Sequence, residues 1–182
     1  LRPGDIYTHV FAELGGAREP VVDYETRKFK PFVREAQERG IIFDVGYGGA
    51  SFDFRQAIPS LEAGFFPNTI STDLHKGSMN AAMKDMLNVM STFMAMGMEI
   101  PHIIKASTWN PAKTIKREEL GHLSEGAIAD LALIEVRQGQ FGIWDKNGYK
   151  LETDKRFECE MTIKDGVIVY SVNGRSEPVV LR

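Results

Sequence analysis

Hydrophobic positions in the first part of the chain form short apolar segments that alternate with helical patterns. Apolar segments cover residues 5–11, 41–45 and 69–73, and a helical pattern follows each of them. Repeated strand and helix units are typical of a parallel sheet with crossover helices. The expected helices are one from Pro31 to Arg39, one capped by Ser51 or Asp53 and ending near Glu62, one from about Met79 to Met96, and two short helices that begin near Pro101 and Pro111.

The hydrophobic period changes from helical to two after Gly121. Three later segments alternate or run as strands, at residues 128–136, 157–163 and 167–172. Lys164-Asp165-Gly166 has the turn chemistry of a hairpin between the last two strands. The pattern therefore predicts two parts, an α/β part over residues 1–120 and a β-rich part over residues 121–182.

Composition limits the kinds of partner that the protein can bind. The 182 residues are 43% hydrophobic and 26% charged, which is typical of a globular chain with a packed core. The 22 Lys and Arg residues against 25 Asp and Glu residues give a net charge of -3, so no strong cationic field attracts nucleic acid or an anionic membrane. No apolar run approaches the length of a membrane span. We expect a small-molecule substrate, with no nucleic acid and no membrane as partner.

The single cysteine indicates a cytoplasmic protein, and the first residues of the chain indicate that a further segment precedes them. Cys159 is the only cysteine, which excludes an internal disulfide and favours a reducing, cytoplasmic compartment. The chain starts at Leu1 rather than Met, and its first residues resemble the middle of a protein. We therefore expect an upstream segment.

Polar side chains follow each apolar segment of the first part. His9 follows the first, Asp44 and a glycine-rich run follow the second, and Asp73 and His75 follow the third. In a parallel sheet with helical crossovers, functional groups collect at the carboxyl ends of the strands. A histidine and an aspartate there can share a divalent metal ion, and the carboxylate can accept a proton from a metal-activated water. The pattern favours hydrolysis.

Each of these residues also has a structural interpretation. A histidine at a strand end is more often hydrogen-bonded than metal-bound, and Asp73 could cap the following turn. Gly46, Gly48 and Gly49 could form a tight turn, and their spacing differs from the phosphate-binding fingerprint. Methionines along the expected helix at residues 79–96 indicate core packing rather than a cofactor pocket.

Four segments of the chain together match the pattern of a known family. Three of them end the apolar segments: Gly4-Asp5-Ile6-Tyr7-Thr8-His9, the run from Phe43 to Phe52 and Thr69-Ile70-Ser71-Thr72-Asp73-Leu74-His75. The fourth is the passage from Asn110-Pro111-Ala112-Lys113 to Ala129-Asp130-Leu131. The first three resemble successive strand ends, and the fourth the exit from the barrel, of the amidohydrolase superfamily, in particular its dihydroorotase-like deacetylases and esterases.

The resemblance implies a fold, a metal and a set of site residues. Residues 1–120 would be strands six to eight of a (β/α)8 barrel with their helices, and residues 121–182 part of a small β-sandwich. The family holds one or two divalent metal ions, usually zinc. His9 would bind one such ion, and Asp73 would bind metal and act as general base and acid. Substrate-binding residues at the mouth of the site would be Tyr47, Gly48, Gly49, Ser51 and His75. Tyr47 stands where relatives often have histidine.

Other metal ligands of the family, a His-x-His pair, a carboxylated lysine and a further histidine, would precede Leu1. The resemblance therefore implies that these residues are the carboxyl-terminal part of an enzyme of about 350–420 residues, within the size range of such barrels. Its function would be hydrolysis of an amide bond, of deacetylase or cyclic amidase type, or of an ester bond in a small molecule. A homo-oligomer is compatible with such a barrel.

Two other functions stay open at this point. The chain could be a non-catalytic, truncated half-barrel or pseudoenzyme that binds a partner chain. A nucleotide-binding α/β domain is a third interpretation, and it depends only on the glycine-rich run at residues 46–49.

Overall fold

Three neighbouring backbone segments run parallel in the computed structural model, which describes residues 1–174. Strand β1 (Ile6–Tyr7) pairs in parallel with strand β2 (Ile42–Phe43). A parallel bridge between Asp44 and Thr69 adds the third segment beside β2. The predicted parallel order of the first part is therefore confirmed, whereas its closure into a barrel stays a prediction.

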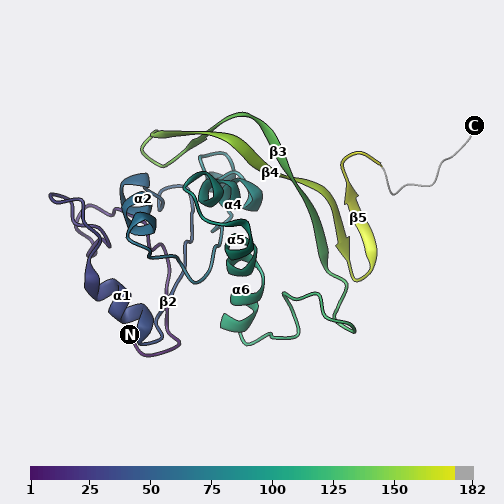
Figure 1. The fold of residues 1–182 in the computed structure, drawn as a ribbon, viewed down its shortest axis with the longest axis horizontal. Coiled ribbons are helices and arrows are strands. Elements are labelled where there is room, and N and C mark those ends of the chain that lie inside the picture. The colour runs from purple at the N-terminus through teal and green to yellow at the C-terminus, as the bar shows by residue number, and fades with distance from the viewer. Residues whose placement is uncertain (175–182) are drawn as a thin grey trace, which may run out of the picture.

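Helices follow the parallel segments and continue as a group of short helices (Figure 1). Local signals explain two of the starts: Pro31 opens the first helix, and the Asp53 side chain accepts a hydrogen bond of 2.8 Å from the Arg55 amide at the start of the second. The helices are α1 (Pro31–Glu38), α2 (Phe54–Glu62), α3 (Lys76–Met79), α4 (Met86–Ala95), α5 (Ile100–Ser107) and α6 (Trp109–Thr114). Within residues 1–174, none is long and apolar enough to cross a membrane.

The single helix expected from Met79 to Met96 is wrong, because the chain turns between α3 and α4. The Asp85 side chain accepts a hydrogen bond of 2.8 Å from the Asn88 amide and so caps the start of α4. The Asn88 side-chain amide donates to the carbonyls of Ala82 and Met83, which satisfies the backbone of the turn. The methionine pattern predicted apolar packing, but the capping side chains decide where the helix begins.

The second part of the chain is an antiparallel sheet that arches over the helices (Figure 1). Strands β3 (Leu131–Trp144), β4 (Lys150–Lys164) and β5 (Val167–Ser171) lie in that order. The predicted hairpin between the last two strands is confirmed, and both turn residues, Asp165 and Gly166, have positive φ, as a type I′ turn requires. The described residues contain one three-stranded sheet here, so the β-sandwich stays a prediction.

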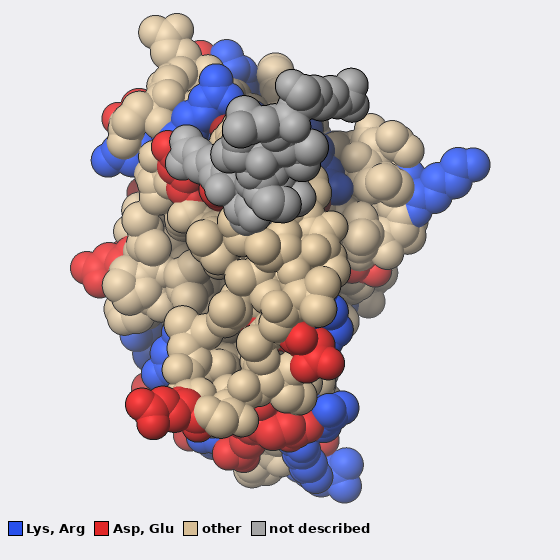
Figure 2. All heavy atoms as spheres, turned by 90° about the vertical axis from the view of Figure 1, so that its right-hand side faces the viewer, with Lys and Arg blue, Asp and Glu red and all other residues tan. Residues whose placement is uncertain are grey.

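Strand β5 leaves apolar side chains exposed at the edge of this sheet. Figure 2 looks at this side of the molecule and shows a largely uncharged surface across its middle, with charged residues nearer the ends. The side chains concerned are 40–62% exposed: Val167, Ile168, Val169, Tyr170 and Val172. Among residues 1–174, no strand pairs with the outer edge of β5, and an apolar edge strand of this kind is typical of a surface that another polypeptide segment covers.

One hydrophobic core joins the two predicted parts of the chain. Aromatic rings lie at its centre: Phe11 meets Phe52 edge to face with centroids 5.9 Å apart, and Phe52 meets Phe93 at 6.0 Å. Ile143 from β3 and Phe157 from β4 are buried in the same cluster. The α/β part and the β-rich part therefore differ in secondary structure but share their packing.

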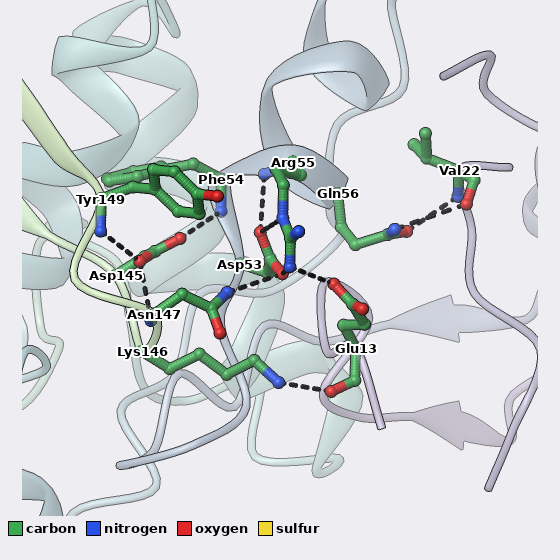
Figure 3. A network of polar contacts seen from close by, with 10 residues as sticks. All are labelled: Glu13, Val22, Asp53, Phe54, Arg55, Gln56, Asp145, Lys146, Asn147 and Tyr149. Atoms are coloured by element: carbon green, nitrogen blue, oxygen red, sulfur yellow. Dashed lines mark hydrogen bonds and ion pairs between the residues drawn. The ribbon is translucent and has the colours of Figure 1, made fainter. Parts of the chain in front are cut away.

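A polar network at the start of α2 also connects the two parts (Figure 3). Arg55 lies between two carboxylates, 2.9 Å from Asp53 Oδ2 and 2.5 Å from Glu13 Oε2. The side-chain amide of Asn147, from the turn between β3 and β4, donates to Asp53 Oδ2 at 2.8 Å. Asp53 is fully buried, so its charge depends on these partners.

The two carboxylates of the network have opposite pKa shifts. Burial favours the neutral form of Asp53, but hydrogen bonds from Arg55 and Glu13, with the positive charge of Arg55, together outweigh burial and hold the pKa of Asp53 below its usual value. A hydrogen bond with Asp53, together with burial, raises the pKa of Glu13. Asp53 therefore stabilises the fold above the usual aspartate pKa of 3.8, and this contribution is lost as the pH falls through its folded value.

We predict that Arg55→Met lowers the free energy of unfolding by about 2 kcal/mol near pH 7, because Asp53 is left buried without its cation. This value is below that of a fully buried pair, since the Arg55 side chain is 34% exposed. The loss should shrink at about pH 4, where protonation of Asp53 or Glu13 relieves the repulsion. Urea denaturation at both pH values measures it.

The control for this prediction is Arg117→Met. Arg117 also pairs with a carboxylate, Glu119, but both side chains are more than half exposed. We expect a change within about 0.5 kcal/mol for this variant. An equal loss for Arg55→Met at the two pH values would contradict the electrostatic explanation.

Candidate functional site

The ends of the three parallel segments meet at one edge of the structure. The ring of His9, which follows β1, lies 2.6 Å from the carbonyl oxygen of Gly46, measured from Nδ1. On the other side, a Cβ atom built on Gly48 would lie only 2.8 Å from Asp73 Oδ2. The segment Gly46–Gly48 therefore lies between the two predicted metal ligands, and the structure brings His9 and Asp73 to the same edge.

The hydrogen bond of His9 determines which ring nitrogen is free. A carbonyl oxygen can only accept, so Nδ1 carries the proton and donates to Gly46, which leaves the lone pair on Nε2. Metal-binding histidines commonly donate their other ring N–H to a backbone carbonyl in this way. The tautomer of His9 therefore suits metal binding through Nε2.

Both candidate ligands have a left-handed backbone. The φ angle is 56° at His9 and 49° at Asp73, in a region that L-residues rarely occupy. The Asp73 carbonyl accepts hydrogen bonds of 3.0 Å from His75 Nδ1 and from Ser78 Oγ, which hold the turn after Asp73. Backbone strain of this kind concentrates at functional sites, where the surrounding structure maintains it.

Asp44 links the three parallel segments through hydrogen bonds to its carboxylate. The sequence did not indicate this linking role. Its carboxylate accepts hydrogen bonds from three hydroxyl groups on the neighbouring segments, at 2.7 Å from Thr8, 2.6 Å from Thr69 and 2.8 Å from Ser71. The Ser71 hydroxyl in turn accepts from the Gly46 amide at 3.0 Å. The available signal was the set of hydroxyl residues within otherwise apolar strands.

Arg18 is a second residue that sequence reasoning missed. Its guanidinium donates to the carbonyl of Thr8 at 3.0 Å and to the carbonyl of His9, and it lies 4.5 Å from the centre of the Tyr7 ring. These contacts fix the backbone on both sides of the His9 peptide. An arginine in the glycine-rich loop after the first strand was the only sequence signal for this role.

The Tyr47 side chain lies in the core rather than at the exposed edge, and a contact of this residue with substrate stays a prediction. Its side chain is 1% exposed and its ring stacks on Phe52, with centroids 4.1 Å apart. The Tyr47 hydroxyl donates to the Trp144 carbonyl at 2.8 Å, and burial raises the pKa of Tyr47. The side chain is part of the core because apolar rings and a β3 carbonyl surround it.

Of the other predicted substrate-binding residues, one backbone donor is already used. The Gly48 amide donates to the Thr72 carbonyl at 2.9 Å, and a contact of Gly48 with substrate stays a prediction. Ser51 Oγ lies 3.5 Å from the position of a Cβ on Gly48, and the His75 side chain is exposed beside Asp73. Contacts of Gly49, Ser51 and His75 with substrate stay predictions.

His9 and Asp73 supply nitrogen and oxygen ligands of the kind that zinc prefers, but only two of the three or four that it needs. Within the part of the chain that the structure describes, no group of three or more His, Cys, Asp and Glu side chains could hold a metal ion.

Comparisons with known proteins identify relatives over most of the chain. The model of the amidohydrolase family matches residues 49–169. A deacetylase of Brucella anthropi is 34% identical over 158 residues, which are 87% of this chain and 38% of that protein. A deacetylase of Enterococcus faecalis is 30% identical over 169 residues, covering 92% of this chain and 45% of the relative.

Solved structures of two enzymes match the fold. A crystal structure of an adenine deaminase has a TM-score of 0.87 at 29% identity and covers 94% of this chain and 46% of that one. A crystal structure of a dihydroorotase has a TM-score of 0.81 at 30% identity and covers 92% of this chain and 45% of that one. The chain thus spans less than half the length of the relatives it matches.

We predict that Gly48→Ala displaces the Asp73 carboxylate. The new Cβ would lie 2.8 Å from Asp73 Oδ2, and the backbone at Gly48 has a φ of 57°. Gly97→Ala is the matched control, because Gly97 also has positive φ but a Cβ there meets nothing within 4 Å. Both variants should lose about 1–2 kcal/mol of unfolding free energy through backbone strain.

Crystal structures and urea denaturation of the two variants measure the difference. Only Gly48→Ala should also move the Asp73 side chain and lose additional stability. If the two variants lose the same stability and Asp73 stays in place, the close approach at Gly48 has no consequence for the site.

Proposed function

Because the chain belongs to the amidohydrolase family, we propose that it forms part of a metal-dependent hydrolase that cleaves an amide or ester bond of a small molecule. The observation that carries the proposal is the approach of His9 and Asp73 to the two sides of Gly46–Gly48 at one strand edge. In such folds, reactive groups gather at the carboxyl ends of the strands.

The proposed metal is zinc, held by His9 Nε2 and the Asp73 carboxylate together with ligands from a further part of a longer protein. The donor set supports this proposal, because imidazole and carboxylate both suit zinc and the His9 tautomer leaves Nε2 free. The relatives' greater length, more than twice that of this chain, also supports it. When bound, the metal supplies a Lewis acid and lowers the pKa of water toward about 7.

Asp73 is the proposed general base and acid. Its exposed carboxylate would accept a proton from the attacking water and deliver it to the leaving nitrogen or oxygen. The hydrogen bonds that His75 and Ser78 donate to the Asp73 carbonyl hold the backbone of the turn that carries this carboxylate. Gly49, Ser51 and His75 are the proposed contacts with substrate.

An N-acyl or cyclic amide compound is the proposed class of substrate. The curated relatives are named deacetylases, and one of the similar solved structures is a dihydroorotase. The fold places the reactive groups at the strand ends, and the loops select the substrate. A panel of N-acyl and cyclic amide compounds therefore identifies the substrate.

We predict that Asp73→Asn in the full-length natural protein lowers kcat about 10²- to 10⁴-fold on N-acetyl and O-acetyl substrates. Asparagine tolerates the left-handed backbone at this position, so the melting temperature should change little. Asp154→Asn, at an exposed position of β4, is the matched control and should keep the wild-type rate.

His9→Ala should weaken zinc binding, measured as zinc retained per chain during dialysis against a chelator. His102→Ala is its control, because the exposed His102 lies on α5 and is not one of the proposed ligands. A wild-type protein without zinc, whose Asp73→Asn variant keeps any hydrolytic rate unchanged, would contradict the proposal. Such a protein in a stable complex with a second chain would instead favour a non-catalytic half-barrel.

A further inference from the structure

The turn between β3 and β4 is bonded to the segment that follows the candidate site. The Tyr47 hydroxyl donates to the Trp144 carbonyl at 2.8 Å. Two more hydrogen bonds join the turn to the start of α2, from Phe54 N to Asp145 Oδ2 at 3.1 Å and from Asn147 Nδ2 to Asp53 Oδ2 at 2.8 Å (Figure 3). A third runs from Lys146 N to Phe52 O at 3.2 Å. Residues almost a hundred positions apart in sequence are therefore held together.

The turn itself is well fixed. Asp145 is 3% exposed, and its Oδ1 accepts hydrogen bonds from the amides of Asn147 at 2.8 Å and Tyr149 at 3.0 Å. Its Oδ2 is the atom that accepts from the Phe54 amide. A buried carboxylate with three backbone donors closes the turn and ties it to α2 at the same time.

Tyr47 connects this turn to the site because of its neighbours. Gly46 accepts the hydrogen bond of His9, and Gly48 lies against the carboxylate of Asp73. Neither glycine has a side chain that could anchor the segment. The segment is held on one side by strand pairing with Ser71 and on the other by the buried Tyr47 side chain.

We propose that Tyr47 is a positioning residue through which the β3–β4 turn sets the geometry of His9 and Asp73. This inference rests on the proposed function. A shift of the turn would move Trp144, and with it the Tyr47 side chain and the two glycines that separate the metal ligands. The antiparallel sheet thus acts on the reaction without touching substrate.

The chemistry of the phenol group fits this role. Burial raises the pKa of Tyr47, so its hydroxyl stays protonated and donates to Trp144 throughout the working pH range. The ring stacks on Phe52, which carries the carbonyl that accepts from Lys146. One side chain therefore joins both the core and the turn.

The test compares three variants of the full-length natural protein. Tyr47→Phe removes the donor to Trp144 and keeps the ring stack, and Asn147→Ala breaks the bond to Asp53 from an exposed position. Ser91→Ala is the matched control. Ser91 is 2% exposed and accepts from the Phe157 amide at 2.8 Å, so it also joins the sheet to a helix, but it makes no contact with residues 46–54 among the hydrogen bonds of the described chain.

Three readouts separate positioning from general stability. For Tyr47→Phe and Asn147→Ala we expect zinc affinity, measured by chelator competition, to fall about tenfold and kcat to fall by a similar factor, with KM within about twofold of wild type. Hydrogen exchange of the amides at residues 46–48 in the metal-free protein should accelerate. Ser91→Ala should lower the melting temperature but leave all three readouts unchanged.

The inference is overturned if Tyr47→Phe and Asn147→Ala behave like Ser91→Ala. If Tyr47→Phe does not fold, Asn147→Ala decides the outcome, because its side chain is exposed. A wild-type protein without zinc or activity would defeat the proposed function instead. Hydrogen exchange would then still show whether the turn controls the segment.

Discussion

The site depends on two glycines, Gly46 and Gly48, because the His9 and Asp73 side chains lie where a Cβ atom at these positions would be too close. A Cβ on Gly46 would lie 2.7 Å from His9 Nδ1, and one on Gly48 would lie 2.8 Å from Asp73 Oδ2. Glycine at both positions lets an imidazole and a carboxylate lie against one short segment. This close contact also lets His9 Nδ1 donate to the Gly46 carbonyl, which selects the tautomer with a free Nε2.

Two kinds of support keep this segment in place. Beneath it, the Asp44 carboxylate collects hydroxyl groups from the neighbouring strands, which links the three parallel segments through hydrogen bonds rather than apolar contacts alone. Beside it, the Tyr47 side chain is packed on Phe52 and bonded to Trp144 of the antiparallel sheet. The sheet that arches over the helices is therefore part of the structure that holds the strand edge.

Sequence patterns predicted the features that depend on local chemistry. Apolar segments ending in His9 and Asp73 indicated the parallel strands, and Pro31 and Asp53 marked helix starts, because each signal acts within a few residues. Features that depend on distant contacts were missed. The burial of Tyr47 was missed in this way, because its partner Trp144 lies 97 positions away. The helix start at Asp85 is a local signal that the methionine pattern hid.

The proposed site requires that His9 and Asp73 share one metal ion in the natural protein. Anomalous X-ray scattering at the zinc edge, from crystals of the full-length protein grown with zinc, tests this claim most directly. We expect a peak within about 2.0–2.2 Å of both His9 Nε2 and a carboxylate oxygen of Asp73. A zinc peak remote from both side chains, or bound through His9 Nδ1 after loss of the Gly46 hydrogen bond, would contradict it.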